Sequence, residues 1–268
     1  MDSLLYVCIL IFTGIIAGFA SGMIGVGGCF IMVPVQYWVL IADGLDSTLA
    51  IRVAFGTGLA VTLPTVMSAA LGHHRRGTVD WKAAFPMGIA AIFGAVTGGT
   101  IATWLPGHIL RIIFAIVVIV MALRMVWIVK ECEECPIRQP LGILLLLGFC
   151  IGNITSLAGV GGGVVLIPIL IILLHYPVHQ AVGTSSACLI FSSAGAVASY
   201  LWYGLGVDGL PAYSIGYIDL IQWAILVGTT IPLSIIGVRF AYRCPAKTLR
   251  YFFVAVMFVV GVLMLVSR

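Results

Sequence analysis

Two glycine-rich interruptions of long apolar runs are the residues in this sequence best suited to chemistry. The first is Gly25-Val26-Gly27-Gly28 and the second is Gly159-Val160-Gly161-Gly162. Glycine adopts positive φ and lets other groups approach the backbone closely. A short helix that begins after each interruption has N–H groups without intrahelical partners and the positive end of a helix dipole, both of which attract anions. The pattern therefore predicts two backbone anion-binding points.

The two interruptions have matched surroundings. Each follows a helix-length apolar segment and precedes a short apolar run that carries a proline, Pro34 in the first copy and Pro168 in the second. In hydrocarbon, broken backbone is tolerated only where it is buried in protein or lines a cavity. A pair of breaks at corresponding places in two halves therefore points to the substrate site of a transporter. Close helix packing by small residues such as Gly14, Gly18 and Gly22 is the alternative explanation.

The composition requires an integral membrane protein. Of the 268 residues, 62% are hydrophobic and only 8% are charged, whereas soluble domains carry about 25% charged residues. None of the nine carboxylates falls in the middle of an expected span, which argues against a cation antiporter or a proton pump. We therefore expect an anion or a neutral solute as cargo, bound by backbone dipoles and hydroxyl groups. No catalytic residue, cofactor, metal site or nucleic-acid partner is predicted.

The hydrophobic segments repeat in the same order on either side of a polar linker at 130–140. A full span needs about 20 residues, so the short runs are predicted to be half-helices that reach the midplane, with tilted full spans as the alternative. The first half, 1–129, is expected to hold segments at 4–24, 28–42, 49–71, 83–104 and 108–129. The second half, 141–268, is expected to hold segments at 141–158, 162–175, 181–203, 217–242 and 247–267.

Further matches between the halves indicate an internal duplication. Gly56-Thr57 corresponds to Gly183-Thr184, and Asp80 corresponds to Asp219, with an ungapped match onward from the two aspartates. A repeat of about five segments is too long to arise readily by chance.

The distribution of Lys and Arg predicts how the halves are oriented. Most of the 13 basic residues flank the loop 72–82, the linker or the last loop, whereas the loop 204–216 has none. By the positive-inside rule, loop 72–82 and the linker are cytoplasmic, and loop 204–216 and both termini are external. The predicted fold is thus an all-α membrane protein of two inverted-topology repeats, each starting with a helix pair broken at the GVGG motif.

Hydroxyl and cationic side chains complete the predicted site. Thr57, Thr184 and Ser185 follow the half-helix hairpins, so a returning span could place them against the breaks, although hydrogen bonding to helix carbonyls is an alternative. Arg52 and His179 would lie at opposite mouths and draw an anion in, or else snorkel to headgroups. The candidate substrate-binding residues are Gly25, Gly27, Gly28, Thr57, Gly159, Gly161, Gly162, Thr184 and Ser185, with Arg52 and His179 as mouth residues.

The linker contains one motif of a different kind. Cys132 and Cys135 form a CxxC, which would suit thiol-redox chemistry or a metal site in another context. A single CxxC without a second ligand pair also occurs by chance. A membrane thiol-redox protein is therefore kept as an alternative function.

Several motifs together carry a resemblance. They are Ala20-Ser21-Gly22-Met23-Ile24-Gly25-Val26-Gly27-Gly28 with Pro34, the second copy through Pro168, Gly183-Thr184-Ser185, and Gly77-Thr78-Val79-Asp80-Trp81. With these motifs essentially the whole chain resembles the sulfite exporter (TauE/SafE) family of membrane permeases. The resemblance implies a permease for sulfite, sulfonates or related organic anions in the cytoplasmic membrane. Gly58 stands where the second half has Ser185, so the two halves would contribute unequally to a site.

The expected protein is a multi-pass secondary transporter of the cell membrane. It would move a small anion, sulfite or another sulfur oxyanion or organosulfonate, by alternating access around a midplane site. A passive anion channel on the same scaffold is the alternative. The expected partners are the anion and the lipid bilayer, and a coupling ion and a homo-oligomer stay open.

Overall fold

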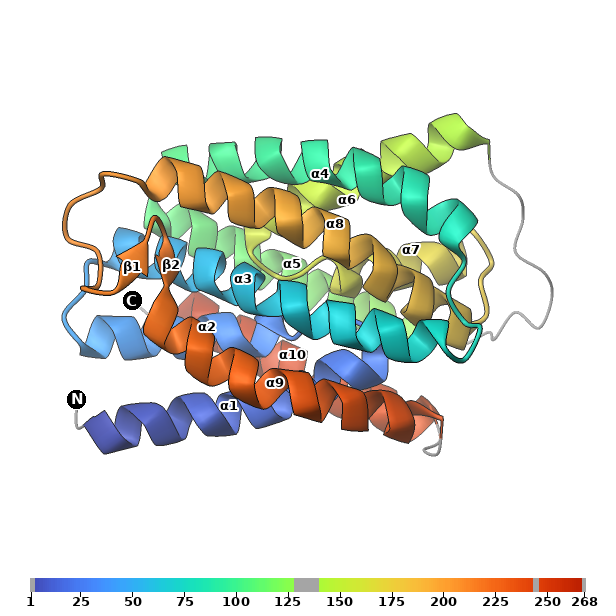
Figure 1. Ribbon diagram of the computed structural model, residues 1–268, viewed down its shortest axis with the longest axis horizontal. Helices are drawn as coiled ribbons and strands as arrows, with labels where there is room; N and C mark the ends of the chain where they lie inside the picture. Colours follow the sequence, from blue (N-terminus) through green and yellow to red (C-terminus); the bar gives the residue numbers. More distant parts are fainter. Residues whose placement is uncertain (1–2, 128–139, 243–245, 267–268) are drawn as a thin grey trace.

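The computed structural model describes residues 3–127, 140–242 and 246–266, and it is almost entirely helical (Figure 1). Most of the linker, with Cys132 and Cys135, lies outside the described residues. The first half contains α1 (Ser3–Ile24), α2 (Cys29–Ala42), α3 (Ser47–His74), α4 (Trp81–Trp104) and α5 (Gly107–Trp127). The second half contains α6 (Leu141–Ala158), α7 (Gly163–Ile172), α8 (Val178–Gly204), β1 (Ser214–Ile215), β2 (Ile218–Asp219), α9 (Leu220–Ala241) and α10 (Ala246–Val266).

Helix lengths divide the elements into two kinds. Within the described residues, seven helices are long and apolar enough to cross a membrane. By contrast, α2 has 14 residues and α7 has 10, which at 1.5 Å per residue gives about 21 Å and about 15 Å. Both are shorter than the roughly 30 Å of the hydrocarbon core. A short helix therefore follows each glycine motif.

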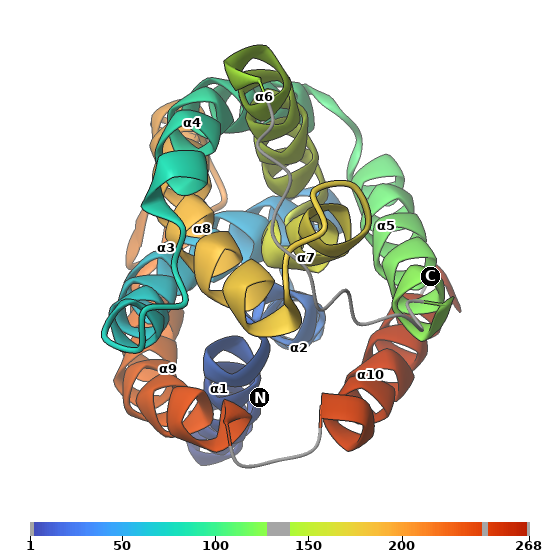
Figure 2. The ribbon, with the colours of Figure 1, turned by 90° about the vertical axis from the view of Figure 1, so that its right-hand side faces the viewer.

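The two short helices occupy the middle of the molecule. Figure 2 shows α2 and α7 inside a ring that includes α4, α5, α6, α9 and α10, and Figure 1 shows them in opposite halves of the long axis. Nearly all their residues are buried, and α3 and α8 are the most buried of the long helices. The core of the protein is thus built from α2, α3, α7 and α8.

Small residues bring the outer helices close together. A Cβ added at Gly18 of α1 would lie 2.6 Å from the carbonyl oxygen of Thr230 in α9. A Cβ at Gly152 of α6 would collide in the same way with the carbonyl oxygen of Ala91 in α4. The flanking glycines therefore serve close packing, as small-residue patterns in membrane helices do. Gly22, Gly94, Gly98 and Gly148 are approached by carbonyl oxygens of the facing helix in the same manner.

A short hairpin precedes α9, where the sequence had predicted the helix to begin at 217. Ser214 pairs with Asp219 and Ile215 with Ile218 in an antiparallel ladder, and the turn is made at Gly216 with φ +58°. The segment stays largely apolar through the turn, so its composition resembles that of the helix that follows. The helix starts only at Leu220, where Asp219 caps it.

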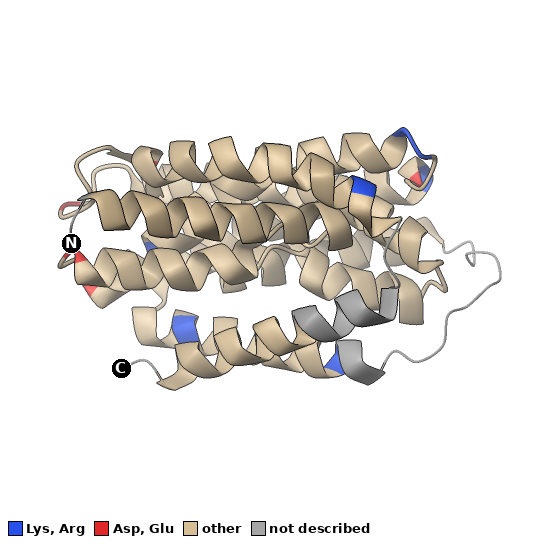
Figure 3. Ribbon diagram, turned by 90° about the horizontal axis from the view of Figure 1, so that it is seen from below, with Lys and Arg blue, Asp and Glu red and all other residues tan. Residues whose placement is uncertain are grey.

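Charged residues gather at the two ends of the described ribbon and are absent from its middle (Figure 3). The α3–α4 turn and the end of α9 lie at one end, while the start of α1, the β1–β2 hairpin and the end of α10 lie at the other (Figure 1). The α3–α4 turn and the end of α9, which were predicted to share a side, therefore lie at the same end of the molecule, whereas most of the linker predicted to lie with them is outside the described residues.

Candidate functional site

Both glycine motifs break the helices at the predicted places. The chain leaves α1 at Ile24 and re-enters a helix at Cys29, and it leaves α6 at Ala158 and re-enters at Gly163. These turns need backbone conformations that residues with a Cβ rarely adopt. Positive φ values of 63° to 87° occur at Gly25, Gly27, Gly28, Gly159 and Gly161.

The two breaks lie directly against each other in the interior. A Cβ at Gly161 would lie 3.1 Å from the carbonyl oxygen of Val26, and one at Gly163 would collide with the carbonyl oxygen of Gly25. The Ser185 hydroxyl donates to the same Gly25 oxygen at 3.2 Å. The structure thus brings together the two breaks and Ser185. Because the contact is direct, an ion can lie between Gly25 and Gly163 only if the breaks separate.

The first break is held by a threonine that the sequence analysis did not select. The Thr62 hydroxyl donates to the Gly27 carbonyl oxygen at 2.8 Å. Its own oxygen lies 2.8 Å from the Cys29 sulfur, so the thiol is the donor in that second bond. All three residues are buried. α3 therefore fixes the backbone immediately before α2.

The second break uses its last glycine differently. Gly162 has an ordinary helical φ of −58°. Glycine is therefore needed there because a side chain would have no room, and not because of the backbone conformation. A Cβ there would collide with the Thr155 hydroxyl, which donates to the Ile151 carbonyl oxygen at 2.6 Å. Gly28, the matching residue of the first break, has φ +76° and approaches the Ala17 carbonyl oxygen. The two motifs are therefore alike in position but not identical in geometry.

Thr57 and Thr184 make the same contact in the two halves. The Thr57 hydroxyl accepts a hydrogen bond from the backbone N–H of Asp219 at 2.9 Å, and Thr184 accepts one from that of Asp80 at 3.0 Å. Each hydroxyl keeps its own proton to donate, and the described residues supply no acceptor for it. The structure thus places both threonines against the starts of α4 and α9.

The two aspartates at these contacts cap their helices. The Asp219 carboxylate accepts the N–H groups of Ile221 and Gln222, and the Asp80 carboxylate accepts that of Lys82. Burial raises the pKa of Asp219, and the two capping bonds lower it by less. Burial and the hydrogen bond to Asp80 raise the pKa of the Tyr176 hydroxyl, which donates to Asp80 at 2.7 Å.

Gln36 is a polar residue at the core that the sequence analysis missed. It is fully buried on α2, and neither its amide nitrogen nor its amide oxygen has a partner among the residues that the structure describes. A Cβ at Gly58 would lie 3.3 Å from that oxygen and 3.7 Å from the Cys29 sulfur. An unpaired buried polar group costs about 1–3 kcal/mol. Gln36 therefore supplies a free amide beside the position where the first half lacks the hydroxyl of Ser185.

The two predicted mouth residues lie at opposite ends of the molecule. Half-buried Arg52, near the start of α3, donates to the carbonyl oxygen of Leu105 at 3.0 Å and to the Tyr217 hydroxyl at 3.4 Å. Exposed His179, at the start of α8, stacks on the Tyr242 ring with centroids 4.8 Å apart. Both side chains are therefore held by neighbours.

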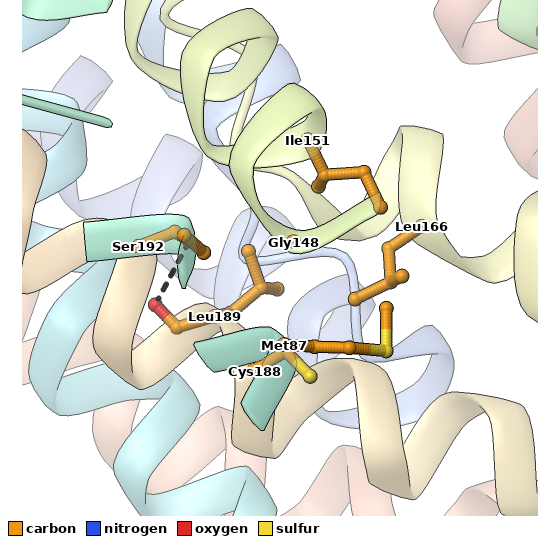
Figure 4. A pocket seen from close by; sticks show the side chains of 8 residues that line it. Met87, Gly148, Ile151, Leu166, Cys188, Leu189 and Ser192 are labelled. Atoms are coloured by element: carbon orange, nitrogen blue, oxygen red, sulfur yellow. Dashed lines mark hydrogen bonds between the residues drawn. The ribbon is translucent and has the colours of Figure 1, made fainter. Parts of the chain in front are cut away.

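A small hollow lies between α4, α6, α7 and α8 (Figure 4). The Ser192 hydroxyl in its wall donates to the Leu189 carbonyl oxygen at 3.4 Å, and the Cys188 thiol donates to that of Ala84 at 3.6 Å. The remaining wall is apolar, so we assign this hollow to helix packing and not to anion binding. Its lining residues are Met87, Ala91, Gly148, Ile151, Leu166, Cys188, Leu189 and Ser192.

Comparison with known proteins gives matches along the whole chain. A family model described as Sulfite exporter TauE/SafE matches residues 10–264. A probable membrane transporter protein of Haemophilus influenzae is 28% identical over 267 residues, which cover 98% of this chain and 98% of that protein. A probable membrane transporter protein of Methanocaldococcus jannaschii is 28% identical over 265 residues, which cover 98% of this chain and 97% of that protein. No solved structure gives a significant match.

Proposed function

The chain belongs to the sulfite exporter TauE/SafE family, and from that premise we propose that it is a secondary transporter for a small anion. Its family and the names of its relatives make it a multi-pass membrane transporter. The cargo we propose is sulfite or another sulfur oxyanion or organosulfonate, as the family description suggests. We assign the protein no catalytic step.

The direct contact between the two breaks is the observation that carries this proposal. α2 and α7 both begin at that contact and run toward opposite ends of the molecule (Figure 1). Their first-turn N–H groups and dipole ends therefore meet at one interior place, where an anion is the favoured ligand. The described residues hold no carboxylate in the middle of a long helix, so nothing there repels an anion. We propose that the substrate binds at Gly25, Gly27, Gly28, Gly159, Gly161 and Gly162.

Polar side chains of the core helices α2, α3 and α8 fit the same role. Ser185 already touches the first break, and Thr57 and Thr184 each keep a hydroxyl proton to donate. The free amide of Gln36 adds a donor from α2. Buried donors without acceptors are costly unless a ligand or water satisfies them. We propose that these four residues complete the shell around the anion.

We further propose that the halves 1–129 and 141–268 are inverted repeats that rock against each other. The reciprocal bonds Thr57–Asp219 and Thr184–Asp80 support this, because each links the third helix of one half to the fourth helix of the other. Separation of the two breaks would open the site, which is the movement that alternating access requires. The basic α3–α4 turn would face the cytoplasm of the cell membrane by the positive-inside rule.

A counterflow assay in proteoliposomes tests the proposal. Vesicles that carry the purified protein and are loaded with unlabelled sulfite should accumulate radiolabelled sulfite transiently, and the flux should saturate. Sulfate, thiosulfate and small sulfonates in the same assay rank the substrates. Flux that rises linearly with concentration and lacks counterflow would instead favour the passive anion channel. The double variant Cys132→Ser and Cys135→Ser should retain counterflow. Loss of counterflow in this variant would favour the thiol-redox alternative.

A further inference from the structure

The first turns of α3 and α5 lie against each other. A Cβ at Gly107, the first residue of α5, would lie 2.6 Å from the Cα of Thr48 near the start of α3. Seven residues further along each helix, the rings of Phe55 and Phe114 stack with centroids 6.0 Å apart. Both helices run away from the end of the molecule that holds the β1–β2 hairpin (Figure 1). The facing stripes of the two helices are therefore in register over two turns.

Arg52 and Arg111 occupy matching places on these stripes. Each lies four residues after the first contact and three residues before the stacked ring. This spacing keeps a residue on one helix face. The two arginines therefore lie at the same level on facing helices, and both are half-buried.

Among the described residues, the hydrogen-bond acceptors of the two guanidinium groups are neutral. Arg52 donates to the Leu105 carbonyl oxygen and the Tyr217 hydroxyl, and Arg111 donates to the Tyr37 hydroxyl at 3.2 Å. The Nε of each arginine is buried and has no partner within the ranges that the structure describes. No carboxylate pairs with either arginine in the part of the chain that the structure describes.

The carboxylate at the start of α3 does not neutralise the pair. Asp46 accepts the backbone N–H groups of Thr48 and Leu49, at 2.8 Å and 3.3 Å, as a helix cap. Two cations at one level of a half-buried interface repel each other more strongly than they would in water. An anion that binds both relieves this repulsion, and guanidinium groups bind planar or tetrahedral oxyanions through paired hydrogen bonds.

We propose that Arg52 and Arg111 form an entrance site for a tetrahedral oxyanion, a sulfate-like or sulfonate-like group. This inference rests on the proposed function in taking the transported anion as the occupant. A phosphate headgroup of a lipid has the same chemistry, and the experiment below separates the two sources. The sequence analysis had selected Arg52 alone, because the partnership with Arg111 depends on the packing of α3 on α5.

The site connects to the core along α2. Tyr37, which holds Arg111, follows Gln36, whose unpaired amide lies beside Gly58. Two helical turns further inward, Cys29 begins α2 at the first break. An anion released from the arginine pair would thus meet a neutral amide donor before it reaches the backbone N–H groups.

Sulfate-dependent thermal stabilisation of the purified full-length protein tests the site. In a phosphate-free maltoside detergent, sodium sulfate should raise the unfolding temperature more than sodium chloride of equal ionic strength. R52Q and R111Q should each weaken the apparent sulfate affinity about tenfold, the effect of one lost charge-assisted hydrogen bond. R124Q is the matched control, because Arg124 is exposed at the other end of α5. It should bind sulfate as the wild type does.

Charge-keeping variants cover the case in which the glutamine variants do not fold. R52K and R111K retain the cation but lose the paired geometry, so they should fold and bind sulfate severalfold more weakly. Wild-type sulfate affinity in folded R111Q or R111K, or an equal response of the wild type to sulfate and chloride, would overturn the site.

Lipid nanodiscs identify the source of the oxyanion. If the occupant is soluble, sulfate stabilises the wild type in phosphatidylglycerol nanodiscs as it does in detergent. If it is a lipid phosphate, the sulfate effect appears in detergent only. Counterflow separates this proposal from the proposed function. If R111Q loses its sulfate affinity but the wild type shows no counterflow, the transporter proposal is refuted and the arginine site is retained. If the wild type shows counterflow but R111Q binds sulfate with unaltered affinity, the arginine site is refuted and the transporter proposal is retained.

Discussion

The hydroxyl of Thr184 accepts a hydrogen bond from the backbone N–H of Asp80, 3.0 Å away and 104 residues distant in the sequence. Thr57 makes the same bond to Asp219 across the opposite pair of elements. Each bond joins a core helix of one half to the capped start of a helix in the other half. The two halves are therefore tied together at both ends by the same interaction.

Removing either hydroxyl should destabilise the protein by a similar amount. T184V and T57V keep the shape of the side chain but leave a backbone N–H unpaired, which costs about 1–3 kcal/mol. T184S and T57S keep the acceptor and serve as controls. In detergent, the unfolding temperature should therefore fall clearly in each valine variant and change little in each serine variant. A fall in one half only would contradict an equivalent role for the two bonds.

The two glycine motifs should respond differently to a methyl group. G28A must adopt a left-handed φ, which costs about 1–2 kcal/mol for a residue with a Cβ, and it also meets the Ala17 carbonyl oxygen. G162A meets mainly the Thr155 hydroxyl. Adding T155A should therefore restore the stability of G162A but not that of G28A. Thermal unfolding of the single and double variants measures this, with T155A alone as the control. If G162A alone is as stable as the wild type, the Thr155 side chain can move away from the added methyl group, and the predicted loss of stability is contradicted.

The pH dependence of stability should carry a contribution from Asp219. Burial raises the pKa of its carboxyl in the folded protein, so the folded state binds this proton more tightly than the unfolded state does. The stabilisation of the folded state by the protonated Asp219 carboxyl is complete below the pKa of this group in the unfolded chain, about 3.9. This stabilisation is lost as the pH rises through the pKa of the group in the folded protein.

D219N removes this titration and keeps a side chain that can cap α9. The unfolding temperature of the wild type relative to D219N should therefore fall as the pH rises from about 4 to neutrality. D208N is the control, because Asp208 is an exposed loop residue. The unfolding temperature of the wild type relative to D208N should show no such trend. A wild type that gains stability relative to D219N over this range would contradict the sign of the shift.

The orientation in the membrane can be tested by labelling single cysteines in intact cells. In a cysteine-free background, D208C should react with a membrane-impermeant maleimide from outside. R75C, in the α3–α4 turn, should react only after permeabilisation. Both positions are exposed. The reverse pattern would place the basic loops outside and overturn the orientation derived from the positive-inside rule.

The positions of the breaks could be predicted from sequence because glycine reports on backbone conformation directly. Five of the eight residues in the two GVGG motifs have positive φ, and the lengths of the apolar runs marked α2 and α7 as short. The starts of the helices lie within a few residues of the expected positions, with caps at Asp80 and Asp219 that the matched sequence had already paired.

Other features could not be predicted because they depend on packing between distant segments. Gln36 stands out in the sequence as an amide in an apolar run, but the lack of a partner for it is visible only in three dimensions. The pairing of Arg52 with Arg111 depends on the contact of α3 with α5. The hairpin before α9 was missed because its residues are as apolar as a helix.

The central claim is that an anion binds to the backbone at the two glycine breaks. Anomalous diffraction from crystals grown with selenate, a tetrahedral analogue of sulfate that contains a heavy atom, locates the ion without assumptions about the protein. The proposed site predicts a selenium peak within roughly 4–5 Å of backbone nitrogens in 27–30 or 161–164, since the oxyanion oxygens would accept N–H bonds of about 2.9 Å. Selenate bound only elsewhere, in protein that still transports it, would contradict the claim.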